Sequence, residues 1–474
     1  MTQSKILAKN TLIIGIGRFS TQIISLLLLP IYTIFLTPSE YGLIDLIVTY
    51  IALLVPVLTI QLEMAVFRFL IDARVDENRK KHVISNVLQM VLAILILFLV
   101  SSLAIANIFD IKYLPLIVLN ICIAIFSNLF LQIARGLGEN KKFAIASVCN
   151  GIINLVGVTL LVVLARNGAV GVLWAMALAS FVSVLYLYFS LHLHRYIGTK
   201  QASKKTKKQL LSYSLPLVPN GVSWWIISVS DRTIITIFLG LAANGIYAVS
   251  AKYAMIFASV FAVYSMALTE SASLNINKKN SATFLSDTNN ASIKLFGALG
   301  LVLIVLCPFV FKWLIGTEFQ QASNYVPILI VAALLNAIVG VYSAIYIAKK
   351  MTKQVASTSI IAAVINIALT ILFINIYGIY AAAIATAVAF LVMAVYRHYD
   401  LKKIITIKYE KGLLTKIAIA YIVVMALFYS NNVYANIANI LVVIVITYLL
   451  NGYLLKHAKN GILHVLLNNK KAIK

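Results

Sequence analysis

The chain has 474 residues, of which 62% are hydrophobic and only 11% are charged, and its formal net charge is +25. A soluble domain carries about 25% charged residues, so this composition excludes a soluble globular protein. Apolar runs of about 18 residues or more, each long enough to cross a bilayer as a helix, recur from end to end. The sequence therefore predicts an all-α polytopic membrane protein.

We predict fourteen membrane-spanning helices. Their limits are 11–36, 43–71, 83–108, 113–136, 143–164, 170–192, 211–239, 246–269, 291–315, 325–348, 356–376, 378–396, 413–429 and 436–455. The first run is too long for the apolar part of a signal peptide and has no small-residue cleavage site after it, so we interpret it as a retained helix.

Basic residues are concentrated in alternate loops between these helices. One set of loops holds clusters such as 79–81 and 204–208, whereas the other holds little more than Lys112, Arg166 and Lys312. The positive-inside rule then places both termini in the cytoplasm, and this distribution argues against nucleic-acid binding. The KKTKK cluster at 204–208 is interpreted as an orientation signal that contacts anionic membrane lipids.

An internal repeat has an offset of 203 residues. YTIFLTPSEYGLIDLIVTY (32–50) is matched at this offset by ITIFLGLAANGIYAVSAKY (235–253). A second similarity, at a different offset, relates GIIN (151–154) to AVIN (363–366). Six duplicated helices give two copies of the same orientation, which predicts lobes related by a parallel pseudo-two-fold axis. We therefore expect a six-helix lobe over 1–203, a second over 204–405, and two additional helices with a basic cytoplasmic tail over 406–474.

Ionisable residues deep inside the predicted helices are few, and they lie in the first two helices of each copy. They are Arg18, Asp45, Glu63, Asp231, Arg232 and Lys252, with Arg68 nearer a cytoplasmic end. A charged residue at mid-membrane costs about 2.5–3.5 kcal/mol, so these side chains should face a wet cavity or one another. An ion pair that only fixes helix packing remains open for each of them.

Two pairs of these charged residues differ in their geometry. Asp231 and Arg232 are adjacent and point about 100° apart on a helix, so they do not simply neutralise each other. Under the repeat, Lys252 corresponds to Thr49, which lies one turn from Asp45. Asp45 and Lys252 are therefore predicted to approach across the pseudo-axis and to pair when an outer gate is closed.

Several motifs resemble those of Wzx-type polysaccharide flippases, a branch of the multidrug/oligosaccharidyl-lipid/polysaccharide (MOP) exporter superfamily. They are QLEMAVFRFL (61–70), PSEYG (38–42), SDR followed by FLG (230–240) and NGIYAVSAKY (244–253). The resemblance covers the whole chain and is strongest in the helices predicted over 11–36, 43–71, 211–239 and 246–269.

The resemblance implies a flippase in the bacterial cytoplasmic membrane, and no enzyme. Its substrate would be an undecaprenyl-diphosphate-linked oligosaccharide used for O-antigen, capsule or exopolysaccharide synthesis, and its partners the polymerase and chain-length proteins of that pathway. Arg and Lys suit a diphosphate, so Arg18, Arg232 and Lys252 would contact the substrate and Arg68 would attract it at the cytoplasmic mouth. Glu63 and Asp231 would carry a coupling H⁺ or Na⁺.

Two other classes of protein compete with this interpretation. A multidrug or toxin cation antiporter shares the superfamily but typically needs acidic residues, whereas the predicted cavity carries at least as many bases. A membrane polysaccharide polymerase would need a sizeable outer loop with catalytic groups, and the outer acids Glu40, Asp110 and Glu318 lie in short turns. We predict no cofactor and no metal, since no nucleotide-binding glycine loop or metal-ligand spacing occurs.

Overall fold

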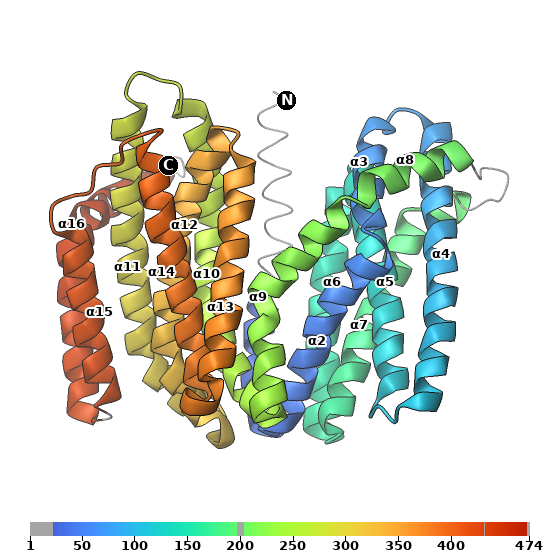
Figure 1. Ribbon diagram of the computed structural model, residues 1–474, viewed down its shortest axis with the longest axis horizontal. Coiled ribbons are helices and arrows are strands. Elements are labelled where there is room, and N and C mark those ends of the chain that lie inside the picture. Colours follow the sequence, from blue (N-terminus) through green and yellow to red (C-terminus); the bar gives the residue numbers. More distant parts are fainter. Residues whose placement is uncertain (1–21, 197–202, 431, 472–474) are drawn as a thin grey trace. The chain divides into compact units, whose positions relative to one another are not determined.

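The computed structural model describes residues 22–196, 203–430 and 432–471. Every regular element among these residues is helical (Figure 1). The chain divides into two compact units: unit 1 is Met1–Gly245 with Gly316–Glu318, and unit 2 is Ile246–Ile315 with Phe319–Lys474. The lobe boundaries predicted from the repeat stay a prediction.

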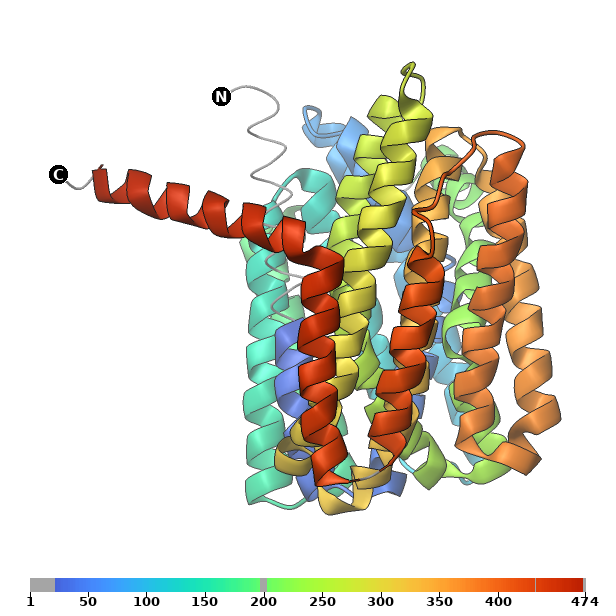
Figure 2. The same ribbon diagram turned by 90° about the vertical axis from the view of Figure 1, so that its left-hand side faces the viewer.

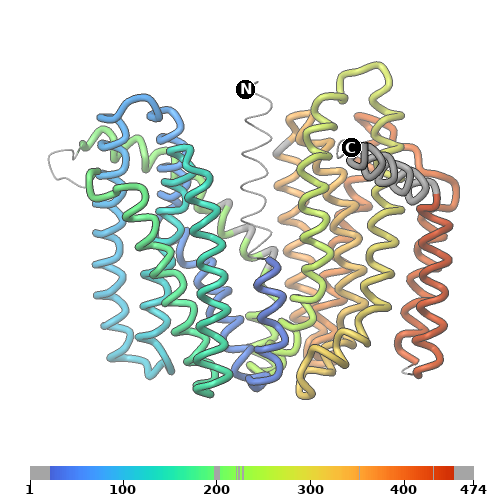
Figure 3. The backbone as a smooth tube through the Cα atoms, turned by 180° about the vertical axis from the view of Figure 1, so that it is seen from behind, coloured from blue at the N-terminus to red at the C-terminus, as the bar shows by residue number. Residues whose placement is uncertain are grey.

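Unit 1 contains the helix Gln22–Phe35 and most of the shorter helices. Its consecutive helices α4 to α7 alternate in direction (Figure 3). Its further helices are α2 (Pro38–Leu58), α3 (Leu62–Asp72), α4 (Glu77–Ile108), α5 (Leu114–Leu137), α6 (Asn140–Val158), α7 (Gly168–Ser190), α8 (Lys204–Ser214) and α9 (Leu217–Leu239). A π-helical turn, Thr159–Leu164, continues α6. One core cluster, which includes the fully buried Leu62 and Leu70, joins α3 to α4 and α5.

Unit 2 contains longer helices, and its last two, α15 and α16, both pack against α11 (Figure 2). The helices are α10 (Leu241–Asn275, which begins in unit 1), α11 (Ser281–Leu314), α12 (Val326–Ala348), α13 (Thr352–Tyr377), α14 (Ile379–Lys402), α15 (Leu413–Tyr429) and α16 (Val433–Lys471). A second core cluster, which includes the buried Tyr342, Ile345 and Tyr346, fills this unit.

Helix length and composition confirm a multi-pass membrane protein. Eleven described helices are long and apolar enough to cross a membrane, and Gln22–Phe35 and Leu413–Tyr429 are shorter apolar helices. Together with α9, they correspond one to one to the fourteen predicted segments. The orientation of the termini stays a prediction.

The predicted helix over 43–71 is two helices, which corrects the sequence analysis. Ile60 and Gln61 both adopt left-handed backbone angles (φ 54° and 56°), and this interrupts the helix between α2 and α3. Pro56, inside the last turns of α2, lacks the N–H that would continue the hydrogen-bond ladder. The predicted helix over 211–239 is likewise divided, at Leu215–Pro216, into α8 and α9.

Within unit 1, two glycines related by the repeat each lie against the first residue of the helix that contains the other glycine. A Cβ on Gly42 would overlap the carbonyl oxygen of Leu241, and a Cβ on Gly245 would overlap that of Pro38. Gly42 and Gly245, and likewise Pro38 and Leu241, are related by the offset of 203 residues. Such exchange of partners is what a two-fold relation produces, so the contact supports the repeat.

Arg397 holds three helices of unit 2 together and was not singled out by the sequence. It lies in α14 and is only 1% exposed. Its guanidinium donates to Ser343 Oγ (2.5 Å) and to the Val339 carbonyl (3.2 Å) on α12. On α13 it donates to Thr358 Oγ1 at 2.7 and 2.9 Å. These acceptors satisfy the buried charge without a carboxylate among the described contacts.

Candidate functional site

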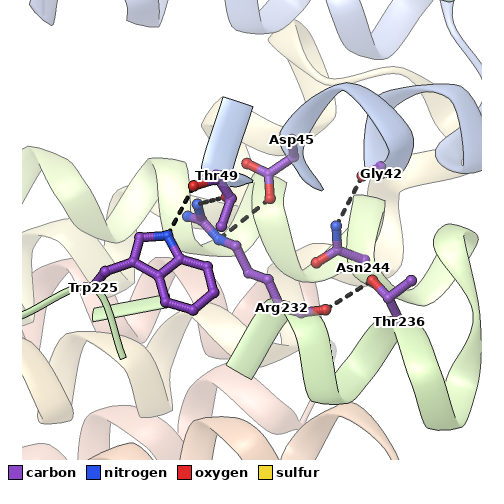
Figure 4. A network of polar contacts seen from close by, with 7 residues as sticks. All are labelled: Gly42, Asp45, Thr49, Trp225, Arg232, Thr236 and Asn244. Atoms are coloured by element: carbon purple, nitrogen blue, oxygen red, sulfur yellow. Dashed lines mark hydrogen bonds and ion pairs between the residues drawn. The ribbon is translucent and has the colours of Figure 1, made fainter. Parts of the chain in front are cut away.

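Arg232 extends from α9 to α2, between Asp45 and Thr49 (Figure 4). Its Nε lies 3.2 Å from Asp45 Oδ2, and its Nη1 donates a hydrogen bond of 3.1 Å to Thr49 Oγ1. The two charged side chains are 19% and 16% exposed. This ion pair is therefore largely, but not fully, buried, and it connects two apolar helices of unit 1.

Aromatic side chains complete the contact between α2 and α9. Trp225 Nε1 donates to the Thr49 carbonyl oxygen at 2.8 Å, and the Trp225 ring lies 5.7 Å from the Tyr50 ring. The Tyr50 hydroxyl lies 3.3 Å from Thr233 Oγ1. Every polar end of these amphipathic rings has a partner, so the surface around Arg232 is fixed before any ligand binds.

The Arg232 guanidinium retains hydrogen-bonding capacity. A guanidinium has five N–H donors in a planar fork. Within the described part of the chain, its contacts use Nε and Nη1, and no residue accepts a hydrogen bond from Nη2. The group can therefore bind an anion in addition to Asp45, with the bidentate geometry that suits phosphate oxygens.

Glu63 is a buried acid at the start of α3, with 8% of its surface exposed. Thr59 Oγ1 lies 2.6 Å from Glu63 Oε2 and 2.8 Å from the Val55 carbonyl oxygen. A hydroxyl carries one proton and cannot donate to both. A protonated Glu63 would donate to Thr59 and leave the Thr59 proton for Val55, so this arrangement satisfies all three groups when the acid is neutral.

The other predicted site residues are placed separately. Arg68 forms an ion pair with Asp72 at 2.6 Å, and both side chains are about half exposed (48% and 47%). Asp231 lies in α9, and Lys252 lies in α10 in the other unit; both are partly exposed. Arg18 lies outside the described residues. The pairing of Asp45 with Lys252 stays a prediction, because these residues belong to different units.

Sequence reasoning placed Thr49 one turn from Asp45 but did not assign it to the site, and it missed Tyr50, Trp225 and Thr233. One signal could have found Trp225. Trp225 and Arg232 are seven residues apart, so they share a helix face. No group of three or more metal-binding side chains occurs among the described residues.

The family model described as "Polysaccharide biosynthesis protein" matches residues 7–269. This is more than half of the chain, and it includes α2, α3, α9 and all of the predicted site residues. The chain belongs to this family. No curated protein matches the sequence.

Several solved structures share the fold of this polysaccharide biosynthesis protein. An inward closed lipid II flippase, MurJ, is 16% identical, with a TM-score of 0.73 over 94% of this chain and 99% of that one. An inward-facing multidrug resistance MATE family transporter of the MOP superfamily is 16% identical, with a TM-score of 0.63 over 82% and 98%. A MOP superfamily transporter from Pyrococcus furiosus is 17% identical, with a TM-score of 0.54 over 83% and 95%. The chain therefore has a MOP-type transporter fold.

Proposed function

We propose that the protein translocates undecaprenyl-diphosphate-linked oligosaccharide repeat units across the bacterial cytoplasmic membrane, for O-antigen, capsule or exopolysaccharide synthesis. The family assignment supports a role in polysaccharide biosynthesis, and the parallel repeat of six helices predicted from the sequence suits alternating access. The flippase among the structural neighbours acts, by its name, on lipid II.

Arg232 is the observation that carries this proposal. Placing a guanidinium between two apolar helices of a membrane protein costs free energy, and charges inside the membrane commonly mark substrate pathways. Its free Nη2 donors suit a phosphate oxygen of the cargo, with Asp45 as the counter-charge while no cargo is bound. In this proposal, Arg18 and Lys252 also contact the diphosphate or sugar, and Arg68 attracts the headgroup at the cytoplasmic mouth.

Glu63 and Asp231 are the proposed coupling sites. The Thr59–Glu63 arrangement favours H⁺ over Na⁺ as the coupling ion, because neutralisation of Glu63 satisfies the hydrogen bonds of both side chains. One charge that moves through about 100 mV supplies about 2.3 kcal/mol, which is enough to bias direction. Asp45 is proposed to exchange between Arg232 and Lys252 as the outer gate opens and closes.

Deletion of the gene tests the proposal. Lipid-linked repeat units should accumulate on the cytoplasmic face, and wild-type protein should restore polymer whereas Arg232→Ala should not. Arg195→Ala, which changes an exposed arginine outside the predicted helices, is the matched control and should restore polymer. Normal polymer in the deletion strain, together with a loss of drug resistance, would contradict the flippase and favour a cation antiporter.

A further inference from the structure

Unit 2 has a cavity of its own between α10 and α12. Its volume is about 340 Å³, within the range of about 300–1,000 Å³ that is usual for small-molecule sites. Phe261 and Ser265 line it from α10, Asn336 lines it from α12, and alanines on both helices keep it open. None of its lining residues is charged.

Asn336 indicates that this cavity opens to water. It lies near the middle of α12, roughly 15 Å from either end at 1.5 Å per residue. Its side chain is exposed, and no described residue forms a hydrogen bond with it. An amide that faced lipid tails there would lose its hydrogen bonds at a cost of several kcal/mol. A wet face, with both a donor and an acceptor available to a ligand, avoids this cost.

Phe261 forms a fixed aromatic wall beside this amide. A Cβ on Gly340 of α12 would lie 2.5 Å from its Cε1 and 2.6 Å from its Cζ, so only a glycine lets the ring lie against that helix. Phe296 packs edge-on against the ring at 5.0 Å between centroids. The ring is therefore held from two sides and presents its remaining surface to the cavity.

We propose that this cavity is a carbohydrate subsite that holds a neutral sugar ring of the cargo, an assignment that rests on the proposed function. A pyranose has an apolar C–H face, which suits the Phe261 ring, and hydroxyl groups, which suit the Asn336 amide and the Ser265 hydroxyl. The absence of charge among the lining residues excludes the diphosphate as the occupant of this cavity and leaves it to Arg232.

Binding measurements with two probes test the assignment on the full-length protein in nanodiscs. The first probe is lipid-linked oligosaccharide extracted from a strain that lacks the protein, and the second is undecaprenyl diphosphate without sugar. Asn336→Ala should raise the Kd of the first probe roughly tenfold and leave the second unchanged, since it removes hydrogen bonds to hydroxyls only. Gly340→Ala should have the same selectivity, because it displaces the Phe261 ring.

Met266→Ala is the control, since Met266 is 65% exposed on α10 and does not line the cavity. It should leave both affinities unchanged. An equal loss of affinity for both probes in Asn336→Ala, or no loss for either, would overturn the sugar subsite while the proposed function stands. A wild-type protein that binds neither probe would overturn the proposed function and the subsite with it.

Discussion

Arg232 has two roles to reconcile, because it both pairs with Asp45 and is proposed to bind the cargo. The ion pair has one-fifth or less of either side chain exposed, so it is screened less than a surface pair. A phosphate would compete with Asp45 for the same guanidinium. Cargo binding would thereby weaken the link between α2 and α9, which is a direct way to couple occupancy to movement.

Exchange of the two charges separates a structural role from a binding role. Arg232→Ala should lower the free energy of unfolding by about 1–3 kcal/mol and abolish transport, since it removes the ion pair with Asp45 and the hydrogen bond to Thr49. The double variant Asp45→Arg with Arg232→Asp should recover thermal stability but not transport, because the positive charge then projects from α2. Thermal unfolding and polymer production measure the two effects. Recovered transport in the double variant would mean that the pair serves packing alone.

Glu63 gives a prediction about pH. Glu63→Gln keeps the shape of the side chain and donates to Thr59 as the protonated acid would. We expect wild-type transport in proteoliposomes to respond to an imposed pH gradient and the variant to be insensitive to it. Glu270→Gln, at an exposed acid near the end of α10, is the control and should respond as wild type does. A retained response in Glu63→Gln would exclude Glu63 as the proton carrier.

The sequence identified both members of the Arg232–Asp45 pair, but it did not predict that they pair. The repeat pointed instead to Lys252 as the partner of Asp45. The offset of 203 residues relates positions by symmetry and says nothing about which side chain of α9 reaches α2. That depends on the rotation of each helix, which the surrounding packing sets and which an apolar segment without a strong amphipathic pattern does not reveal.

At the scale of elements, two glycines allow the first turns of α2 and α10 to lie close together. Gly42→Ala and Gly245→Ala should destabilise the protein to a similar extent, by about 1–3 kcal/mol each, because each Cβ meets a backbone carbonyl of the other helix start. Gly452→Ala, whose added Cβ would have no neighbour closer than 4.0 Å, is the control. Thermal unfolding in detergent measures the difference. Unchanged stability of Gly42→Ala would contradict this close approach.

The packing of α12, α13 and α14 depends on the hydrogen bonds of Arg397. Arg397→Lys should lower the free energy of unfolding by about 1–3 kcal/mol, because the three donors on one ammonium nitrogen cannot replace the planar fork of three nitrogens that reaches α12 and α13. Arg195→Ala, at an exposed position, should have little effect on thermal unfolding. Wild-type stability in Arg397→Lys would show that the guanidinium contacts contribute little.

The elements show which parts of the fold a sequence can predict. Long apolar runs located all fourteen segments, because the bilayer sets their length. The break between α2 and α3 was missed, since no glycine marks the left-handed backbone at Ile60 and Gln61. Arg397 was missed because the predicted helix ended at residue 396, and this placed the arginine in a loop, whereas α14 continues to Lys402.

For the whole molecule, the family is one of polysaccharide biosynthesis proteins, and the fold is the one found in MOP superfamily transporters. Cargo identity comes from the sites, since one superfamily fold serves several kinds of transport. We propose that Arg232 binds the charged end of the cargo and that the cavity beside Asn336 binds a sugar. Both assignments depend on movement of a lipid-linked oligosaccharide between leaflets.

The most direct test measures that movement in proteoliposomes. A fluorescent lipid-linked oligosaccharide is placed in both leaflets, and a membrane-impermeant reductant bleaches the outer one. We expect wild-type protein to make the whole fluorescent pool accessible to bleaching, and Arg232→Ala to slow this exchange at least tenfold. Bleaching that stops at the outer leaflet with wild-type protein, as in protein-free vesicles, would show that the protein does not move this lipid between leaflets.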